Sequence, residues 1–126
     1  MINVNKQLAQ DFTDEVFKVL RETPDCDIYK AIEIAAKRPA PQFYISSFNR
    51  TVLYITRLLH GKTLPISNPQ KVAQYEEIYR RYLPRHAGKR VNLDTLAAIL
   101  NEPAPSWYRV TSTLLQLFYK NQRHKL

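Results

Sequence analysis

Apolar side chains recur every three or four residues along most of the chain, which is the spacing of one buried helix face. In the first stretch, Leu8, Phe12, Val16 and Val19 share such a face. The pattern predicts a helix from about Asn5 to Arg21, and a proline follows its end.

The same reasoning predicts five further helices. Asp25 or Asp27 is the expected cap of the second, and Ser46 or Ser47 that of the third. An Asn-Pro pair opens the fourth, which is the favoured order of cap and first helical residue. The predicted ranges are about 27–37, 46–61, 68–84 and 93–101, and the sixth helix begins within 106–111 and runs into the C-terminal tail.

A short phrase occurs twice. Pro-Ala-Pro-Gln-Phe-Tyr at 39–44 returns as Pro-Ala-Pro-Ser-Trp-Tyr at 103–108, 64 positions later, with helical stretches on both sides of each copy. We therefore predict an all-α fold of about six helices, in which two pseudo-repeated three-helix units, about 1–63 and 64–126, pack into one bundle. The whole chain, 1–126, is expected to be a single helical domain.

The aromatic pair in each copy of this phrase has two interpretations. A residue before a proline avoids the helical region, so each phrase should form an extended elbow between helices. The rings would then plug the elbows into the core, or they would stay exposed and grip a base or a peptide. We expect the core position for Phe43, Tyr44, Trp107 and Tyr108.

Charge is spread unevenly over the 126 residues, which carry a formal net charge of +8. The first 63 residues hold nine basic and seven acidic side chains, and the other 63 hold ten and four. The second half is therefore the candidate surface for a polyanion.

A dense basic run lies at the end of the fourth predicted helix and in the loop after it. Such a cluster would neutralise several phosphates if its members faced one way, or it would be a solvated end that suits the helix C-terminus. Glu76 and Glu77 point apart on this helix, and each is expected to pair with Arg80 or Arg81. The predicted nucleic-acid contacts are Arg80, Arg81, Arg85, Lys89 and Arg90, helped by Arg50 and Arg57 of the third helix.

Three tyrosines, Tyr75, Tyr79 and Tyr82, fall on one face of the fourth helix. Either they pack on the core, or they form a protein–protein face, since tyrosine is common in interface hot spots. They are the candidate protein-interface residues.

Little in the sequence supports catalysis. The histidines are scattered, no histidine or cysteine cluster has zinc spacing, and two isolated glycines cannot form a phosphate loop. The lone Cys26 lies between two aspartates, which should raise the pKa of a thiol rather than activate it. We expect no enzyme activity, no catalytic residue, no metal and no cofactor. The longest apolar runs, about five residues, exclude a membrane-spanning segment.

The phrase Ala-Ala-Lys-Arg-Pro-Ala-Pro-Gln-Phe-Tyr-Ile-Ser at 35–46 resembles a motif in small, basic, uncharacterised proteins of phages and mobile elements. This resemblance implies an accessory or structural protein of such an element and no particular activity. The stretch from Asn49 to Lys62 is similar to the recognition helix of helix-turn-helix repressors. The linker before it has about seven residues and two prolines, whereas that motif uses a three- or four-residue turn.

The function predicted from these patterns is a non-catalytic, nucleic-acid-binding accessory protein of a phage or mobile element, with DNA as the expected partner. The alternative is a structural or adaptor protein, such as a virion component, that acts through protein–protein contacts. A small antagonist that blocks a host protein is a third interpretation. The expected location is the cytoplasm or a virion, and self-association into a homo-oligomer is left open.

Overall fold

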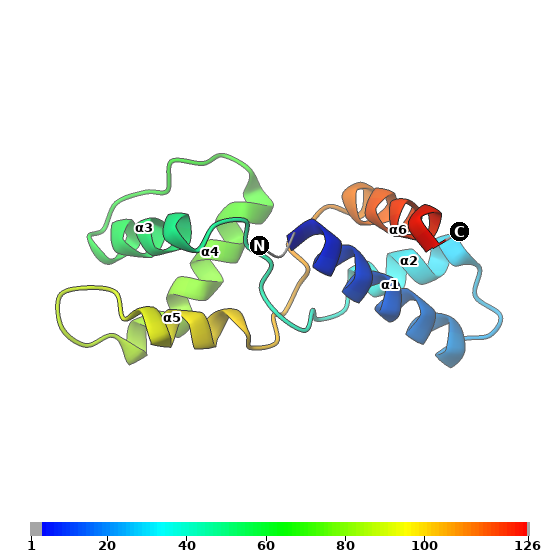
Figure 1. Cartoon of the computed structure of the whole chain (residues 1–126), viewed down its shortest axis with the longest axis horizontal. Coiled ribbons are helices and arrows are strands. Elements are labelled where there is room, and N and C mark those ends of the chain that lie inside the picture. Colours follow the sequence, from blue (N-terminus) through cyan, green and yellow to red (C-terminus); the bar gives the residue numbers. More distant parts are fainter. Residues whose placement is uncertain (1–3, 126) are drawn as a thin grey trace. The chain divides into compact units, whose positions relative to one another are not determined.

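The computed structural model describes residues 4–125, and over that range the protein is all-α (Figure 1). This confirms the predicted fold class and its six helices, and no strand forms within the described range. No helix in this range is both long and apolar enough to cross a bilayer. The elements are α1 (Val4–Glu22), α2 (Ile28–Ala36), α3 (Phe48–Leu59), α4 (Pro69–Tyr82), the 3-10 turn η1 (Leu83–Arg85), α5 (Leu93–Leu100) and α6 (Thr111–Lys125).

Side-chain caps fix where four of these helices begin. Asp27 accepts a hydrogen bond from the Lys30 N–H at the start of α2, and Ser47 does the same for α3. Asn68 caps α4 ahead of Pro69, and Asn92 caps α5. Of the alternatives in the sequence, Asp27 and Ser47 are thus the residues that cap.

The chain divides into two compact units. Unit 1 contains the chain up to Tyr44 and from Pro103 onward, so it holds α1, α2 and α6. Unit 2 spans Ile45–Glu102 and holds α3, α4, η1 and α5. Unit 2 is therefore an insertion in the chain of unit 1, and each unit has its own core.

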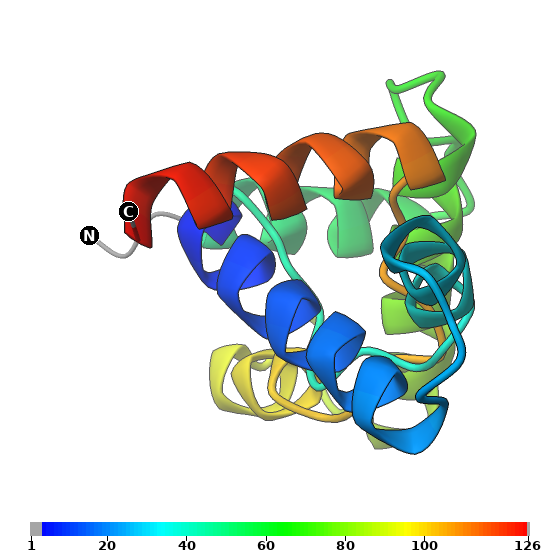
Figure 2. The same cartoon turned by 90° about the vertical axis from the view of Figure 1, so that its right-hand side faces the viewer.

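The core of unit 1 lies between its three helices, which Figure 2 shows from one side. α1 contacts both α2 and α6, and α2 contacts α6 as well. The residues at helical spacing on α1 are buried, as the pattern predicts. The fully or almost fully buried side chains of these three helices include Leu8, Phe12, Val16, Val19, Ala31, Ile32, Ala35, Leu114 and Phe118.

The two Pro-Ala-Pro segments meet within unit 1. Ala40 and Ala104 form an isolated antiparallel bridge, in which each N–H donates to the carbonyl of the other at 2.9 Å. Because proline has no N–H, the alanine is the only residue of each Pro-Ala-Pro that can donate. The sequence phrase therefore allows one pair of hydrogen bonds and no longer ladder.

The rings that follow the two segments stack in pairs across this bridge. Tyr44 stacks on Trp107 with 5.8 Å between ring centroids, and Phe43 stacks on Tyr108 at 6.1 Å. All four residues are buried, which confirms the expected core position. The Tyr44 hydroxyl donates to Asp11 on α1 at 2.6 Å, and burial raises the pKa of Tyr44 well above its ordinary value.

Arg109 links the two segments that carry these stacked rings. The Arg109 guanidinium donates to the carbonyls of Trp107, Tyr108 and Tyr44 at 3.0–3.2 Å. Tyr108 has a φ of 54°, a left-handed conformation that costs energy outside glycine. The hydrogen bond from its N–H to the Ser106 hydroxyl and the Arg109 contact hold it there.

Unit 2 is built around α4, which contacts α3, η1 and α5. α3 buries Thr51, Tyr54 and Ile55, and the Tyr54 ring meets the Tyr75 ring edge-on at 4.9 Å. From α5, Leu96 and Ile99 are fully buried.

The fully buried Tyr82 fixes the loop between η1 and α5. Its hydroxyl accepts a hydrogen bond from the Asn92 N–H at 2.9 Å and lies 2.7 Å from His86 Nδ1. Since the Asn92 N–H already donates to this oxygen, the hydroxyl proton is free to be donated to His86. One side chain thus holds both ends of the loop 86–92.

Candidate nucleic-acid interface

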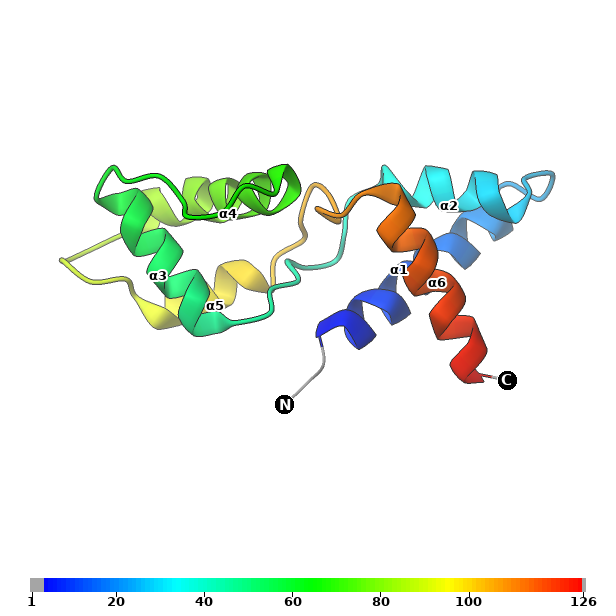
Figure 3. The same ribbon diagram turned by 90° about the horizontal axis from the view of Figure 1, so that it is seen from above.

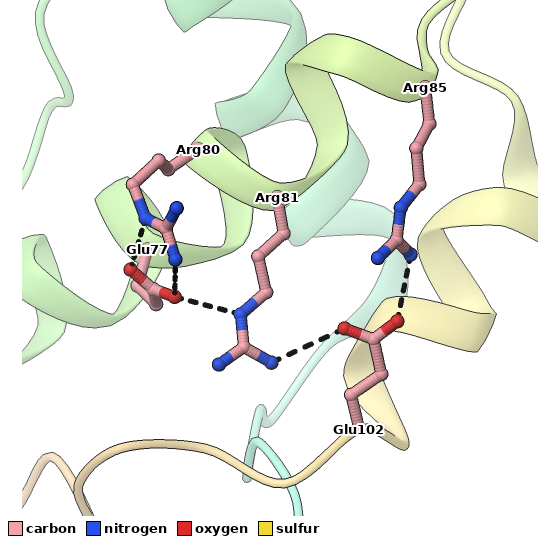
Figure 4. A network of polar contacts seen from close by, with 5 residues as sticks. All are labelled: Glu77, Arg80, Arg81, Arg85 and Glu102. Carbon is pink, nitrogen blue, oxygen red and sulfur yellow. Dashed lines mark hydrogen bonds and ion pairs between the residues drawn. The ribbon is translucent and has the colours of Figure 1, made fainter.

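The predicted arginine cluster folds into an ion-pair network on α4 (Figure 4). Arg80 lies three residues and Arg81 four residues after Glu77, so all three share one helix face. Two Arg80 nitrogens donate to the Glu77 carboxylate at 2.7–2.8 Å, and Arg81 Nε donates to it at 2.7 Å. This confirms the expected pairing of Glu77 with these arginines.

A second carboxylate extends the network. Glu102, just before the second Pro-Ala-Pro, accepts from Arg81 at 3.3 Å and from Arg85 at 2.8 Å. Hydrogen bonds from Arg80 lower the pKa of Glu77, and those from Arg85 lower the pKa of Glu102, so both carboxylates are charged at neutral pH. Three arginines and two glutamates leave one net positive charge here.

This pairing changes what the three arginines offer to a phosphate. The Arg81 side chain is only 19% exposed and bridges both glutamates, whereas that of Arg80 is 71% exposed. A phosphate at Arg81 would have to displace a carboxylate, while Arg80 and Arg85 keep an open side. Their role as phosphate contacts stays a prediction.

The remaining predicted contacts of the basic run, Lys89 and Arg90, lie in the loop 86–92. Both are exposed, and neither side chain has an ionic partner among residues 4–125. Gly88 has a φ of 83°, the left-handed conformation that glycine adopts readily. The loop contains no acidic residue, so its two charges are not offset locally.

α3 contributes the other predicted cations. Arg50 is exposed near the start of the helix, and the Arg57 Nε donates to the Thr63 carbonyl at 3.0 Å. The sequence from Ile34 to Tyr75 contains no aspartate or glutamate, so α3 and the segment after it are free of carboxylates. Lys62, in that segment, is exposed as well.

Two of these acid-free segments lie at the same end of unit 2. The turn that follows α3 and the loop 86–92 both reach this end in two perpendicular views (Figures 1 and 3). We call the pair the cationic end of unit 2. Its exposed charges are those of Lys62, Lys89 and Arg90, and no acidic residue occurs in 60–62 or 86–92.

The tyrosine stripe of α4 lies mostly in the core. Tyr75 and Tyr82 are buried, and only Tyr79 of the three candidate protein-interface residues is partly exposed. The core interpretation of the stripe therefore fits Tyr75 and Tyr82, and an interface role stays a prediction for Tyr79.

An exposed aromatic group on unit 1 was not found from the sequence. The ring centroids of Phe17 and Phe118 lie 6.0 Å apart, those of Phe118 and Tyr119 lie 5.4 Å apart, and those of Tyr119 and Tyr29 lie 6.4 Å apart. We call these four residues, which come from α1, α2 and α6, the aromatic face of unit 1. The available signal was a lysine directly after Phe17, Tyr29 and Tyr119, but the three pairs are far apart in the chain.

Within the described residues, no group of three or more histidine, cysteine, aspartate or glutamate side chains could hold a metal ion. Nor does the sequence supply a motif for any other cofactor. Comparison of the chain with protein-family models, curated proteins and solved structures finds no significant match, so the resemblance to phage and mobile-element proteins stays a prediction.

Proposed function

We propose that this protein is a non-catalytic, nucleic-acid-binding accessory protein that contacts phosphates through unit 2. The observation that carries the proposal is the cationic end, where exposed lysine and arginine side chains occupy two segments without carboxylates. Unit 2 as a whole has nine basic and four acidic side chains. Such a surface favours a polyanion through counterion release.

The ion-pair network suggests that the predicted contact residues have different roles. Lys89, Arg90 and Arg50 are exposed and would bind phosphate directly. Arg80 and Arg85 would add to the same field from the side, and Arg81 would hold α4 to the segment that follows α5. Contacts of this kind position a protein on a nucleic acid but do not specify its sequence.

Titration of a labelled DNA duplex at two salt concentrations tests this proposal. We expect the double variant Lys89→Gln, Arg90→Gln to lower affinity about tenfold at about 50 mM salt and to reduce the salt slope by about two units. The matched control, Lys6→Gln with Lys37→Gln, removes the same net charge from exposed positions of unit 1 and should have a smaller effect. No duplex binding by the wild-type protein at low salt would contradict the proposal.

We also propose that the chain contains two copies of one helical unit. Each compact unit has a long helix, a short helix and a third helix that comes after one of the Pro-Ala-Pro segments in the sequence. In that order they are α1, α2 and α6 in unit 1, and α4, α5 and α3 in unit 2. The reciprocal Ala40–Ala104 bridge supports this, as does the crossed stacking of each ring pair. Under this proposal the two copies exchange their third helices.

The repeat proposal has a geometric test. In an experimental structure, α1, α2 and α6 should superpose in that order on α4, α5 and α3. Helix directions that differ between the two units would contradict it.

A further inference from the structure

The aromatic face of unit 1 is unusual because two of its rings are exposed. Tyr29 is 62% exposed and Phe17 is 38% exposed. The buried Phe118 lies beside Phe17 and Tyr119, and Tyr119 in turn lies beside Tyr29. Large rings that stay in water forfeit the free energy of burial, so a cluster of them marks an interaction surface.

Three helices bring these rings together. Figure 2 shows α1, α2 and α6 arranged around unit 1, and each of the three contacts the other two. Phe17 comes from α1, Tyr29 from the first turn of α2, and Tyr119 from α6. A hydrogen bond between the Tyr29 and Tyr119 hydroxyls raises the pKa of Tyr119, which agrees with the close approach of the two side chains.

Charge around the face indicates the chemistry of its occupant. Lys18, Lys30 and Lys120 each follow an aromatic residue of the face directly, and all three are exposed. Adjacent residues on a helix point about 100° apart, so each lysine lies at the edge of the helix face that carries its ring. Among residues 4–125, the ion pair found for them is a long, exposed contact of Lys30 with Glu33 at 4.0 Å, which contributes little.

Rings flanked by cations match one kind of polymer. In a single-stranded nucleic acid, planar bases alternate with phosphates, so bases can stack on exposed rings while the phosphates meet positive charges. In a duplex the bases are already stacked and paired, and their faces are not accessible. We propose that the aromatic face of unit 1 is a stacking surface for the unpaired bases of a single-stranded nucleic acid. This inference rests on the proposed nucleic-acid-binding function and adds a second surface to it.

The test compares a fluorescein-labelled oligothymidylate of about 15 nucleotides with a duplex, each titrated with the full-length protein. Replacing both Tyr29 and Tyr119 by leucine keeps apolar bulk but removes the rings. We expect this variant to bind the oligothymidylate at least about tenfold more weakly and the duplex as the wild type does. Phenylalanine at both positions restores the rings without the hydroxyls, and its affinity should stay within about twofold of the wild type.

Two controls separate stacking from general damage. Tyr79→Leu makes the same chemical change on α4 and should leave oligothymidylate binding unchanged. Neutralising Lys18, Lys30 and Lys120 to glutamine should reduce the salt slope for the single strand by about two units. Circular dichroism confirms that each variant is folded.

Distinct outcomes separate the two proposals. If the leucine variant binds the oligothymidylate like the wild type, or loses duplex binding to the same extent, the stacking proposal is overturned and the proposed function stands. A wild-type protein that binds the duplex but not the oligothymidylate has the same consequence, and the face would then serve a protein partner. A wild-type protein that binds neither probe overturns both.

Discussion

The residue before each Pro-Ala-Pro segment is held by side chains of the opposite charge, and one of these residues belongs to each unit. In unit 1 that residue is Arg38, which donates to Glu15 at 3.0 Å and Glu22 at 2.8 Å. In unit 2 it is Glu102, which accepts from Arg81 and Arg85. One cation between two carboxylates therefore has its counterpart in one carboxylate between two cations.

This difference in charge determines how many unpaired charged side chains each unit keeps for binding a partner. Arg38 consumes two of the seven carboxylates of unit 1, whereas Glu102 engages two of the nine cations of unit 2. Part of the basic run in the sequence is therefore structural. The cations that stay open in unit 2 include those of its cationic end and Arg50 on α3. Those of unit 1 include Lys18, Lys30 and Lys120, each next in sequence to a ring of the aromatic face.

The largest expected effect distinguishes the two cores. Trp107 is almost completely buried, stacks on Tyr44, meets Phe12 edge-on at 5.3 Å and donates from Nε1 to the Ala35 carbonyl at 3.1 Å. Trp107→Ala should lower the free energy of unfolding by about 3–5 kcal/mol through a large cavity. Trp107→Phe, which keeps a ring, should cost less.

Hydrogen exchange would show which unit loses stability in the Trp107→Ala variant. In Trp107→Ala, amides of α1 and α6 should exchange faster, while those of α4 keep their protection because unit 2 has its own core. Equal acceleration in α4 would contradict the independence of the two cores.

A smaller effect is expected where Tyr82 holds the cationic loop. Tyr82→Phe removes the acceptor of the Asn92 N–H and the partner of His86, which should cost about 1–2 kcal/mol of unfolding free energy. Duplex affinity should fall too, since Lys89 and Arg90 lie in the loop that these bonds fix. The control Tyr79→Phe, at a partly exposed position, should change stability by less than about 0.5 kcal/mol. If Tyr82→Phe unfolds in urea at the same midpoint as the wild type, the two hydrogen bonds of Tyr82 do not stabilise this loop.

How far the sequence predicts this fold depends on how local each signal is. Helices were predictable because their apolar stripes and caps lie within one element, as for Asn68 with Pro69. Which helices form a compact unit was not predictable, since nothing within α6 indicates that it packs on α1 and α2. That grouping depends on the Ala40–Ala104 bridge, between residues 64 positions apart.

The same distinction applies to the candidate interface. Glu77 and its arginines are one helical turn apart, so their pairing followed from spacing. Glu102 lies 17 residues from Arg85 and reaches it only because α5 turns back along α4. The neutralising role of Glu102 and the assembly of the aromatic face therefore required the tertiary structure.

Removing the charge of Glu102 and removing that of Arg38 should have different effects on duplex binding. Glu102→Gln releases Arg85 and removes one of the two carboxylates that Arg81 contacts, so duplex affinity at low salt should rise about two- to fivefold, although stability falls by about 1 kcal/mol. Arg38→Gln removes a cation and frees only carboxylates, so it should give no gain in affinity. Titration of both variants against the same duplex measures this contrast, and equal shifts for the two would argue against a neutralising role for Glu102.

The smallest expected effect is a pH dependence that is stronger in unit 2. Hydrogen bonds to arginine hold the pKa of Glu77 and of Glu102 below the ordinary value of 4.5, and Arg38 does the same for Glu22. A lowered folded-state pKa stabilises the folded protein above pH 4.5, and this contribution is lost as the pH falls through the lower value. The free energy of unfolding should therefore drop between about pH 5 and pH 3.

Glu102→Gln should flatten this drop by about 1 kcal/mol or less, because the pair is partly exposed. Glu33→Gln, whose carboxylate makes only the 4.0 Å contact with Lys30, should retain the wild-type profile in urea titrations across this range. If the stability of Glu102→Gln and that of Glu33→Gln depend on pH in the same way, the ion pairs of Glu102 do not cause the loss of stability in acid.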